Sequence, residues 1–159
     1  MAHKNQRMLY ATDLSAGAIG AMRYAVNYAS RHSARLIVFH VISPRSIACT
    51  KILATFFNEG QEHKIRQKKI NAALWRMEKL MDKICEKHPH AHDAYMHNVE
   101  HLIVHAGKVA EEIIDKAGRW GCALIILGPG RRSLLKRVFS LDISRKVIRR
   151  TDIPVHVIK

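Results

Sequence analysis

The chain of 159 residues has few cysteines and no long apolar run, and both absences narrow its class. Its three cysteines, Cys49, Cys85 and Cys122, lie far apart and form no CxxC pair. This spacing argues against a disulfide framework, so we expect reduced, mostly structural thiols. No run reaches the roughly 18 to 20 apolar residues of a membrane span, and the first residues contain no signal-peptide core. We therefore expect a soluble, cytoplasmic protein.

Acidic residues are also scarce. The chain has 13 Asp and Glu against 27 Lys and Arg, which gives a formal net charge of +14. This imbalance favours polyanionic partners, whether nucleic acids, phosphorylated ligands or acidic membrane surfaces. Three catalytic motifs, GxSxG, GxxxxGK[ST] and HExxH, do not occur. Nothing in the sequence therefore requires an enzymatic function.

A regular alternation of strand and helix signals is present instead. Short apolar, β-branched segments predict strands, and apolar positions that recur at steps of three and four predict helices. The expected strands are residues 8–12, 35–42, 98–106, 122–127 and 153–158, and the expected helices are residues 16–31, 61–87, 107–118 and 133–149. A variable connection is expected at about 43–60 and a histidine-rich loop at 88–97.

The length and the alternation predict one α/β domain over residues 1–159. We expect a five-stranded parallel sheet, doubly wound with helices on both faces, of the Rossmann-like type. In such sheets, ligands bind beyond the carboxyl ends of the strands at the point where the strand order reverses. The junctions after Thr12, Val41 and Leu127 are therefore the first places to search for a site.

Three segments resemble a known family. They are MLYATDLSAGAIGAMRYAVNYA with LIVFHV, then GKVAEEIIDKAG, and finally ILGPGRRSLLKRVFSLDISRKVIRRTDIPVHVI. They cover most of the chain outside residues 43–97 and resemble the universal stress protein family. The resemblance implies an adenine-nucleotide alpha-hydrolase-like sheet and a homodimer formed through the last strand. The apolar stretch IPVHVI agrees with such a dimer, because an apolar strand left at a sheet edge is an aggregation hazard.

Some members of that family bind ATP through a motif G-x-x-G-x9-G-[S/T], an acid after the first strand and a backbone contact at the end of the second. Other members lack the motif and bind no nucleotide. The resemblance places the acid at Asp13, the backbone contact at Val41 and the first glycine at Gly128. The second glycine falls at Arg131, and Gly130 replaces it only after a slip of one residue.

The remaining motif positions depart from the family pattern, with Leu141 at the third glycine and Asp142 at the hydroxyl residue. Glycine lets backbone N–H groups approach phosphate and permits a positive φ, and a branched leucine obstructs both. A carboxylate at a helix start caps the helix and repels an anion. Arg131 and Arg132 offer an alternative, since guanidinium groups bind phosphate by charge and by bidentate hydrogen bonds. We predict a degenerate motif without tight ATP binding.

Several of these residues have an alternative interpretation. Asp13, two residues before Ser15, suits the turn and the first helix N-terminus as well as a ribose or base. Eight basic residues between Arg131 and Arg150 form either a solvated helix face or a non-specific, salt-dependent polyanion surface. Specific nucleic-acid recognition is disfavoured because Phe139, on the expected buried stripe, is the only aromatic residue among them.

Histidines and tryptophans favour structural interpretations. His101 and His105 would share one strand face but lie about 13 Å apart along it, too far to bind one metal ion. The histidines of the 88–97 segment are expected in a solvated loop, with a weak surface metal site as the alternative. Trp75 and Trp120 are expected to pack against the core rather than to bind a ligand.

These observations predict a universal-stress-type cytoplasmic stress-response protein that acts by binding or association, without catalytic or metal-binding residues. The alternative is an ATP- or AMP-binding switch with a rebuilt, arginine-assisted phosphate site and at most slow ATP hydrolysis. The residues expected to bind the nucleotide in that case are Asp13, Val41, Leu127, Gly128, Gly130, Arg131 and Arg132. A second copy and other proteins are the expected partners.

Overall fold

The computed structural model describes residues 6–15, 17–46, 59–87, 92–128 and 134–158. Five strands form one sheet in the order β3-β2-β1-β4-β5, and every neighbouring pair is parallel. The strands are β1 (Arg7–Ala11), β2 (Arg35–Ile42), β3 (Val99–Ala106), β4 (Cys122–Leu127) and β5 (Val155–Val157). The helices are α1 (Ala18–Arg31), α3 (Glu59–Lys87), α4 (His92–Asn98), α5 (Val109–Arg119) and α6 (Leu134–Arg150). The predicted fold class is confirmed.

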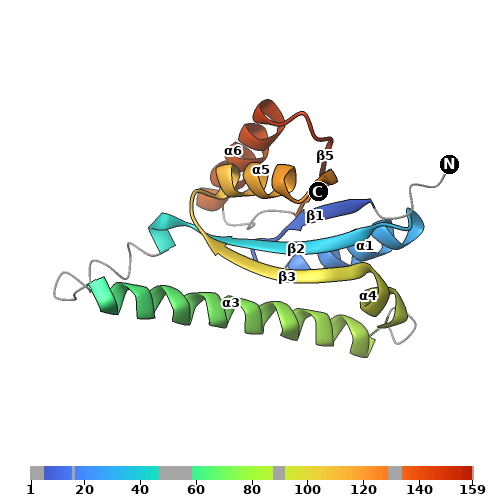
Figure 1. Ribbon diagram of the computed structural model, residues 1–159, viewed down its shortest axis with the longest axis horizontal. Coiled ribbons are helices and arrows are strands. Elements are labelled where there is room, and N and C mark those ends of the chain that lie inside the picture. Colours follow the sequence, from blue (N-terminus) through green and yellow to red (C-terminus); the bar gives the residue numbers. More distant parts are fainter. Residues whose placement is uncertain (1–5, 16, 47–58, 88–91, 129–133, 159) are drawn as a thin grey trace.

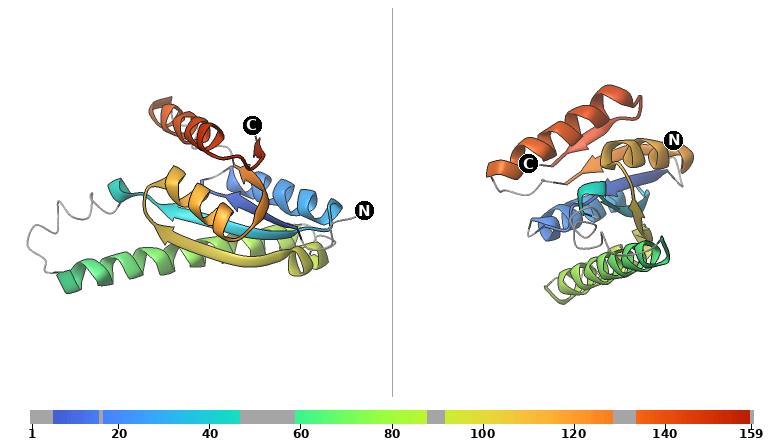
Figure 2. Two further views of the ribbon diagram at one scale, coloured as in Figure 1. Left: turned by 45° about the horizontal axis from the view of Figure 1, so that its top comes forward. Right: turned by 90° about the vertical axis from the view of Figure 1, so that its left-hand side faces the viewer.

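Helices cover both faces of the sheet, with α1 and α3 on one face and α5 and α6 on the other (Figures 1 and 2). Successive side chains of a strand point to opposite faces. In β1, Met8 and Tyr10 therefore pack in the core on the α1 and α3 face, whereas Leu9 packs in the core on the α5 face. A strand covered on both sides has to be apolar throughout, which explains the sequence RLIVFHVI of β2.

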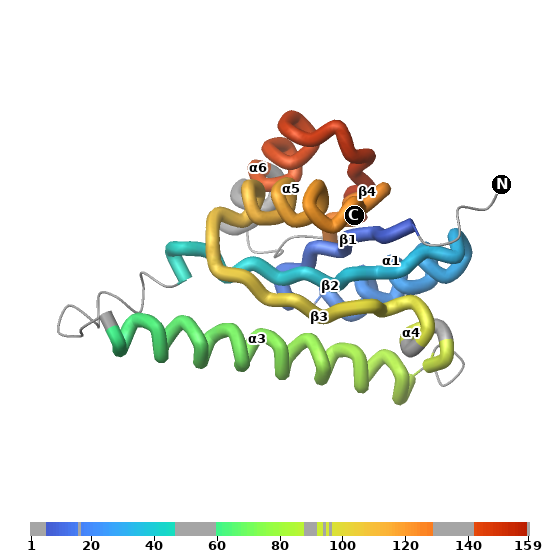
Figure 3. The backbone as a smooth tube through the Cα atoms, viewed as in Figure 1, coloured from blue at the N-terminus to red at the C-terminus, as the bar shows by residue number. Residues whose placement is uncertain are grey.

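The long helix α3 runs alongside β3 (Figure 3). Ala73, Met77 and Ile84 are buried against the core, and their spacing of four and seven places them on one helix face. Burial of a side chain of the size of Met77 or Ile84 contributes about 1.5–3 kcal/mol. Trp75 lies off this face and is 60% exposed, so the prediction that it packs against the core is wrong.

The histidine-rich segment differs from the predicted loop, because residues 92–98 form the short helix α4. Tyr95 is buried in the core at 1% exposure and anchors this helix against the rest of the molecule. An aromatic side chain supplies a large apolar surface, which helps such a short helix to form. Residues 88–91 lie outside the described part of the chain.

Two boundaries also differ from the prediction. α3 begins at Glu59, so the connection expected at about 43–60 ends earlier, and its residues 47–58 lie outside the described part of the chain. β5 covers 155–157 rather than 153–158, because Pro154 has no N–H and Ile153 donates its own to Thr151 Oγ1 at 3.2 Å. β5 pairs with β4 and forms one edge of the sheet.

Candidate functional site

A cleft of about 500 Å³ lies at the carboxyl ends of β1 and β4. The strand order reverses between these strands, because the chain moves from β1 outward to β2 and β3 and then returns to β4 on the other side. Open α/β sheets bind ligands at such switch points, and the volume falls within the range of small-molecule sites. The described lining comes from the ends of β1, β2 and β4 and from α3, α5 and α6.

The turn after β1 forms the floor of the cleft and is held by its own side chains. Thr12 Oγ1 accepts a hydrogen bond from the Leu14 N–H at 3.2 Å, and Asp13 Oδ1 accepts one from the Ser15 N–H at 2.9 Å. Leu14 has a φ of 55°, in the left-handed region that costs a non-glycine residue on the order of 1 kcal/mol or more. The two side-chain hydrogen bonds help to stabilise this strained conformation. The structural role foreseen for Asp13 in the turn is therefore present.

Helix α3 is joined to the loops on either side of the cleft through two cations. Arg76 Nη2 donates to the Leu14 carbonyl oxygen at 3.2 Å, which fixes α3 to the strained turn. Lys69 Nζ donates to the carbonyl oxygen of Ser46, beyond the end of β2. Both cations line the cleft, together with the single described carboxylate of the lining, Asp13.

The end of β2 presents backbone groups to the cleft at Val41. β1 and β2 are paired as far as Ala11 and Phe39, and the Thr12 N–H donates to Phe39 O at 2.9 Å. Backbone groups of residues two apart on a strand point to the same side, so those of Val41 point beyond the end of β1. The Thr12 carbonyl accepts a hydrogen bond from His40 Nδ1 at 2.7 Å, so a side chain takes over where the backbone pairing of β1 and β2 ends. An N–H and a C=O of Val41 are thus directed toward the cleft.

Gly128, the first residue after β4, lies against the end of β1. Its N–H donates to Ala11 O at 3.1 Å. A Cβ atom at this position would come within 3.1 Å of Tyr10 Oη. The Tyr10 hydroxyl is completely buried and has no hydrogen-bond partner among the described residues, and burial raises the pKa of Tyr10 to about 12. Limited space, rather than a left-handed φ, therefore favours a glycine at this position.

Of the residues proposed from the sequence to bind a nucleotide, Asp13, Val41, Leu127 and Gly128 all line this cleft. They come from three different strand ends that lie far apart in the chain. The other three, at positions 130 to 132, lie outside the described part of the chain. The fold thus brings together every described member of the predicted set.

The motif positions at 141 and 142 need a correction. Asp142 is not at a helix start, because α6 begins at Leu134, and it forms an ion pair with Lys146 at 2.9 Å on the next turn. The carboxylate therefore does not cap the helix N-terminus. Two residues further on, Ser144 lines the cleft, next to the partly buried Ile143. The side chain of Leu141 lies outside the described part of the structure.

Sequence reasoning missed Lys69, Arg76, His40 and Ser144, which also line the cleft. The two cations belong to a helix with many basic residues, and only its rotation about its own axis shows which of them face the cleft. Ser144 had a signal, since it lies on the α6 face that also carries Val147, which is buried. Residues three apart on a helix lie on neighbouring positions of one face.

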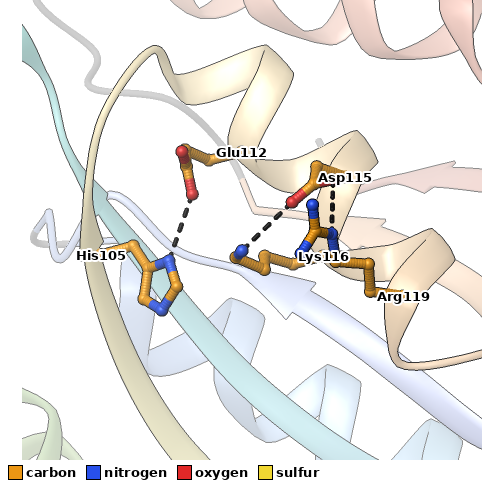
Figure 4. A network of polar contacts seen from close by, with 5 residues as sticks. All are labelled: His105, Glu112, Asp115, Lys116 and Arg119. Carbon is orange, nitrogen blue, oxygen red and sulfur yellow. Dashed lines mark hydrogen bonds and ion pairs between the residues drawn. The ribbon is translucent and has the colours of Figure 1, made fainter.

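Polar contacts surround α5, which forms a wall of the cleft (Figure 4). His105 Nδ1, at the end of β3, lies 3.1 Å from Glu112 Oε2 on α5. On the same helix Asp115 contacts Lys116 at 3.1 Å and Arg119 at 2.8 Å. The hydrogen bond from Lys116, with that from Arg119, lowers the pKa of Asp115. These residues lie outside the cleft lining, and among them only the His105–Glu112 contact joins α5 to the sheet, because the contacts of Asp115 lie within the helix.

Trp120, after α5, packs edge-on against Phe39 with ring centroids 5.4 Å apart, as the sequence predicted for this tryptophan. Within the described ranges, no three His, Cys, Asp or Glu side chains gather where they could hold a metal ion. No helix in those ranges is both long and apolar enough to cross a membrane.

The parallel sheet and the cleft at its switch point define a doubly wound α/β protein. A model of the universal stress protein family matches residues 4–159, and the chain therefore belongs to that family. The resemblance seen in the sequence is confirmed.

Known relatives agree with this assignment. Universal stress protein MJ0577 from Methanocaldococcus jannaschii is 25% identical over 162 residues, which cover 97% of this chain and 94% of that protein. The solved structure of MJ0577 has a TM-score of 0.67 at 24% identity and covers 97% of this chain and 95% of its own. A universal stress protein in complex with cAMP has a TM-score of 0.59 at 17% identity, with 97% and 96% covered. A third, from Archaeoglobus fulgidus in complex with dAMP, has a TM-score of 0.53 at 16% identity and full coverage of both chains.

Proposed function

We propose that this universal stress protein binds an adenine nucleoside monophosphate in the switch-point cleft and acts by binding and association rather than by catalysis. The cleft itself carries the proposal. It combines a carboxylate at Asp13, backbone groups at Val41 and a close backbone approach at Gly128. A carboxylate accepts hydrogen bonds from ribose hydroxyl or adenine amino groups, and backbone N–H and C=O groups suit the edge of a purine.

Two relatives support the choice of a monophosphate. One structure of a universal stress protein contains cAMP, and another, from Archaeoglobus fulgidus, contains dAMP. Both ligands carry a single phosphate on an adenine nucleoside, which is adenosine in cAMP and deoxyadenosine in dAMP. The nucleoside half of the family's site is the half that this chain retains, through the residues at the ends of β1 and β2.

This chain has fewer residues suited to binding a triphosphate. The family's ATP motif has glycine at the positions of Arg131 and Leu141 and a hydroxyl at Asp142. The Asp142 carboxylate is paired with Lys146, and in the sequence it stands where the motif has a hydroxyl residue that donates to phosphate. We therefore propose that ATP binds no more tightly than AMP, and that hydrolysis of ATP is slow at most.

Calorimetric titration of AMP and of ATP with magnesium, into protein stripped of ligand by refolding, tests this function. We expect AMP to bind and ATP to bind no more tightly. The Asp13→Ala variant should weaken AMP binding about tenfold, as expected for loss of a hydrogen bond to a charged group. Asp152→Ala, which removes an exposed carboxylate outside the cleft lining, is the matched control. Absence of heat with AMP would refute the proposal, and ATP binding far tighter than AMP would refute the loss of the motif.

A gain-of-function variant tests the motif directly. Leu141→Gly with Asp142→Ser restores two family positions and should raise the affinity for ATP while that for AMP stays nearly unchanged. A glycine inside a helix costs about 1 kcal/mol, so circular dichroism should first show that the variant keeps its helix content. An unchanged affinity for ATP in the folded variant would show that these two positions do not limit triphosphate binding.

The wider setting of the protein is also proposed. We propose a single cytoplasmic domain that works in a stress response as a homodimer, joined through β5, the edge strand that pairs with β4 alone in the described sheet. Val157 on this strand is 38% exposed, which suits a partly apolar contact. Light scattering should give the mass of two chains at micromolar concentration, and Val157→Lys should shift it toward one. A monomeric mass for the unaltered protein would refute the dimer.

A further inference from the structure

The wall that α3 contributes to the cleft consists of Lys69, Ala72, Ala73 and Arg76. Residues three, four and seven positions apart lie on one face of a helix, so this face carries two alanines between two cations. Seven residues span about 10 Å along the helix axis. The small alanine side chains leave the space between the cations open to a ligand, whereas larger residues would fill it.

Both cations are held in position by carbonyl oxygens rather than by carboxylates. Lys69 donates to the carbonyl oxygen of Ser46, and Arg76 donates through Nη2 to the carbonyl oxygen of Leu14. A carbonyl oxygen orients a cation but does not neutralise it. Arginine has five N–H donors and lysine three, so each group has donors beyond the one used in these contacts. None of the ion pairs among the described residues involves either side chain.

The rest of the described lining offers an anion only hydroxyl groups, His40 and backbone groups, without a further lysine or arginine. Val109, Ile113 and Ile143 make the opposite wall apolar, and Asp13 at the floor would repel a negative group. Lys69 and Arg76 are the only lysine and arginine in the described lining. A ligand whose uncharged end reaches Asp13 would therefore place its negative end toward α3.

We propose that Lys69 and Arg76 form an anion subsite that binds the phosphate group of the nucleoside monophosphate. The proposal rests on the proposed function, because it assigns the phosphate end of the same ligand. Side-chain charges on α3 take the place of the backbone donors that the family motif supplies from the loop after β4. Guanidinium and ammonium groups bind phosphate through charge-assisted hydrogen bonds, which are stronger than neutral ones.

Comparison of AMP with adenosine isolates the phosphate contribution. Calorimetry or ligand-observed NMR gives both affinities for the unaltered protein and for Lys69→Gln and Arg76→Gln. We expect each substitution to weaken AMP binding about tenfold, toward the adenosine value, and to leave adenosine binding unchanged. Lys69→Arg and Arg76→Lys, which keep the charge, should restore most of the AMP affinity. Lys68→Gln and Arg66→Gln, exposed residues of α3 outside the cleft lining, are matched controls.

The other outcomes overturn the inference in different ways. Equal losses for AMP and adenosine would mean that the cations only hold the loops at Leu14 and Ser46. An unchanged AMP affinity in both variants, with a loss in Arg131→Gln plus Arg132→Gln, would place the phosphate on the loop after β4 and leave the proposed function standing. Absence of binding of both ligands to the unaltered protein would overturn the proposed function together with the subsite.

Discussion

Substitution of Gly128 by alanine tests how tightly the strand ends are packed around the cleft. The new methyl group would lie 3.1 Å from Tyr10 Oη, 3.3 Å from Tyr10 Cε2 and 3.5 Å from the Ala11 carbonyl oxygen. The first two distances are shorter than ordinary contacts, and Tyr10 is completely buried, so the ring has to shift by a few tenths of an ångström within a packed core. Overpacking of this kind costs about 1–3 kcal/mol.

The Tyr10 hydroxyl provides a second arm for the same test. It is buried without a hydrogen-bond partner among the described residues, a state that costs about 1–3 kcal/mol. Tyr10→Phe removes both this cost and the closest contact with the new methyl group. We therefore expect Tyr10→Phe to raise the free energy of unfolding by about 1 kcal/mol, and Gly128→Ala to cost about 1 kcal/mol less in that background.

Urea denaturation of the four proteins in this cycle gives the coupling energy, and thermal unfolding should shift by about 2–4 °C for each kcal/mol. Gly118→Ala is the matched control, because a Cβ atom there meets nothing within 4 Å and alanine favours the helix. A neutral Gly128→Ala, or effects that add within about 0.5 kcal/mol, would refute the argument from close packing.

Three further outcomes follow from individual side chains. Arg7 binds Glu100 through two hydrogen bonds of 2.9 Å, and hydrogen bonding from Arg7 lowers the pKa of Glu100. The pair therefore stabilises the fold at a pH above the ordinary pKa of a glutamate, near 4.3, and this contribution is lost as the pH falls through the lower pKa that Glu100 has in the folded protein. Glu100→Gln should reduce the free energy of unfolding at pH 7 and make it depend less on pH in the acid range. Burial raises the pKa of Cys122 to about 11, so peptide mapping after thiol labelling at pH 8 should find this residue unmodified in the native protein. Asp13→Asn should keep the turn hydrogen bond and stability while weakening nucleotide binding, whereas Asp13→Ala should lose about 1 kcal/mol as well; equal stability of the two variants would contradict the structural role.

The sequence was sufficient for the fold because β2 and β4 are apolar on both faces and the longer helices repeat apolar residues at steps of three and four. It also predicted that Asp13, Val41, Leu127 and Gly128 lie close together, since the carboxyl ends of parallel strands meet at one edge of the sheet. These positions depend on chain order and register, which a periodic pattern encodes. Tyr95 shows the limit, because one buried aromatic residue turned a polar, histidine-rich segment into a helix.

The cations of the cleft could not be predicted in the same way. Basic residues occur on much of the surface of α3. The spacing of its apolar residues distinguishes the buried face from the exposed one, but it does not show which exposed residues face the cleft and which face solvent. Lys69 and Arg76 face the cleft, whereas Lys68 and Arg66 do not, because the rotation of α3 about its own axis turns only the first two toward the strand ends. That rotation is set by the packing of Met77 and its neighbours against the core, a tertiary effect without a local signal.

Under the proposed function, the loss of the family's glycine and hydroxyl residues after β4 and the presence of Lys69 and Arg76 on α3 are related, because the two cations replace the lost phosphate donors. A glycine-rich cradle binds phosphate through backbone donors, whose positions are fixed by the loop that contains them. Side chains on a neighbouring helix reach the same cleft from the opposite side, and their placement depends on Arg76 holding the strained turn at Leu14. Phosphate binding would then be linked to the position of α3. A ligand that binds only the native state stabilises it by RT ln(1 + [L]/Kd). AMP should therefore protect the α3 amide hydrogens from exchange, and adenosine at the same concentration should protect them much less.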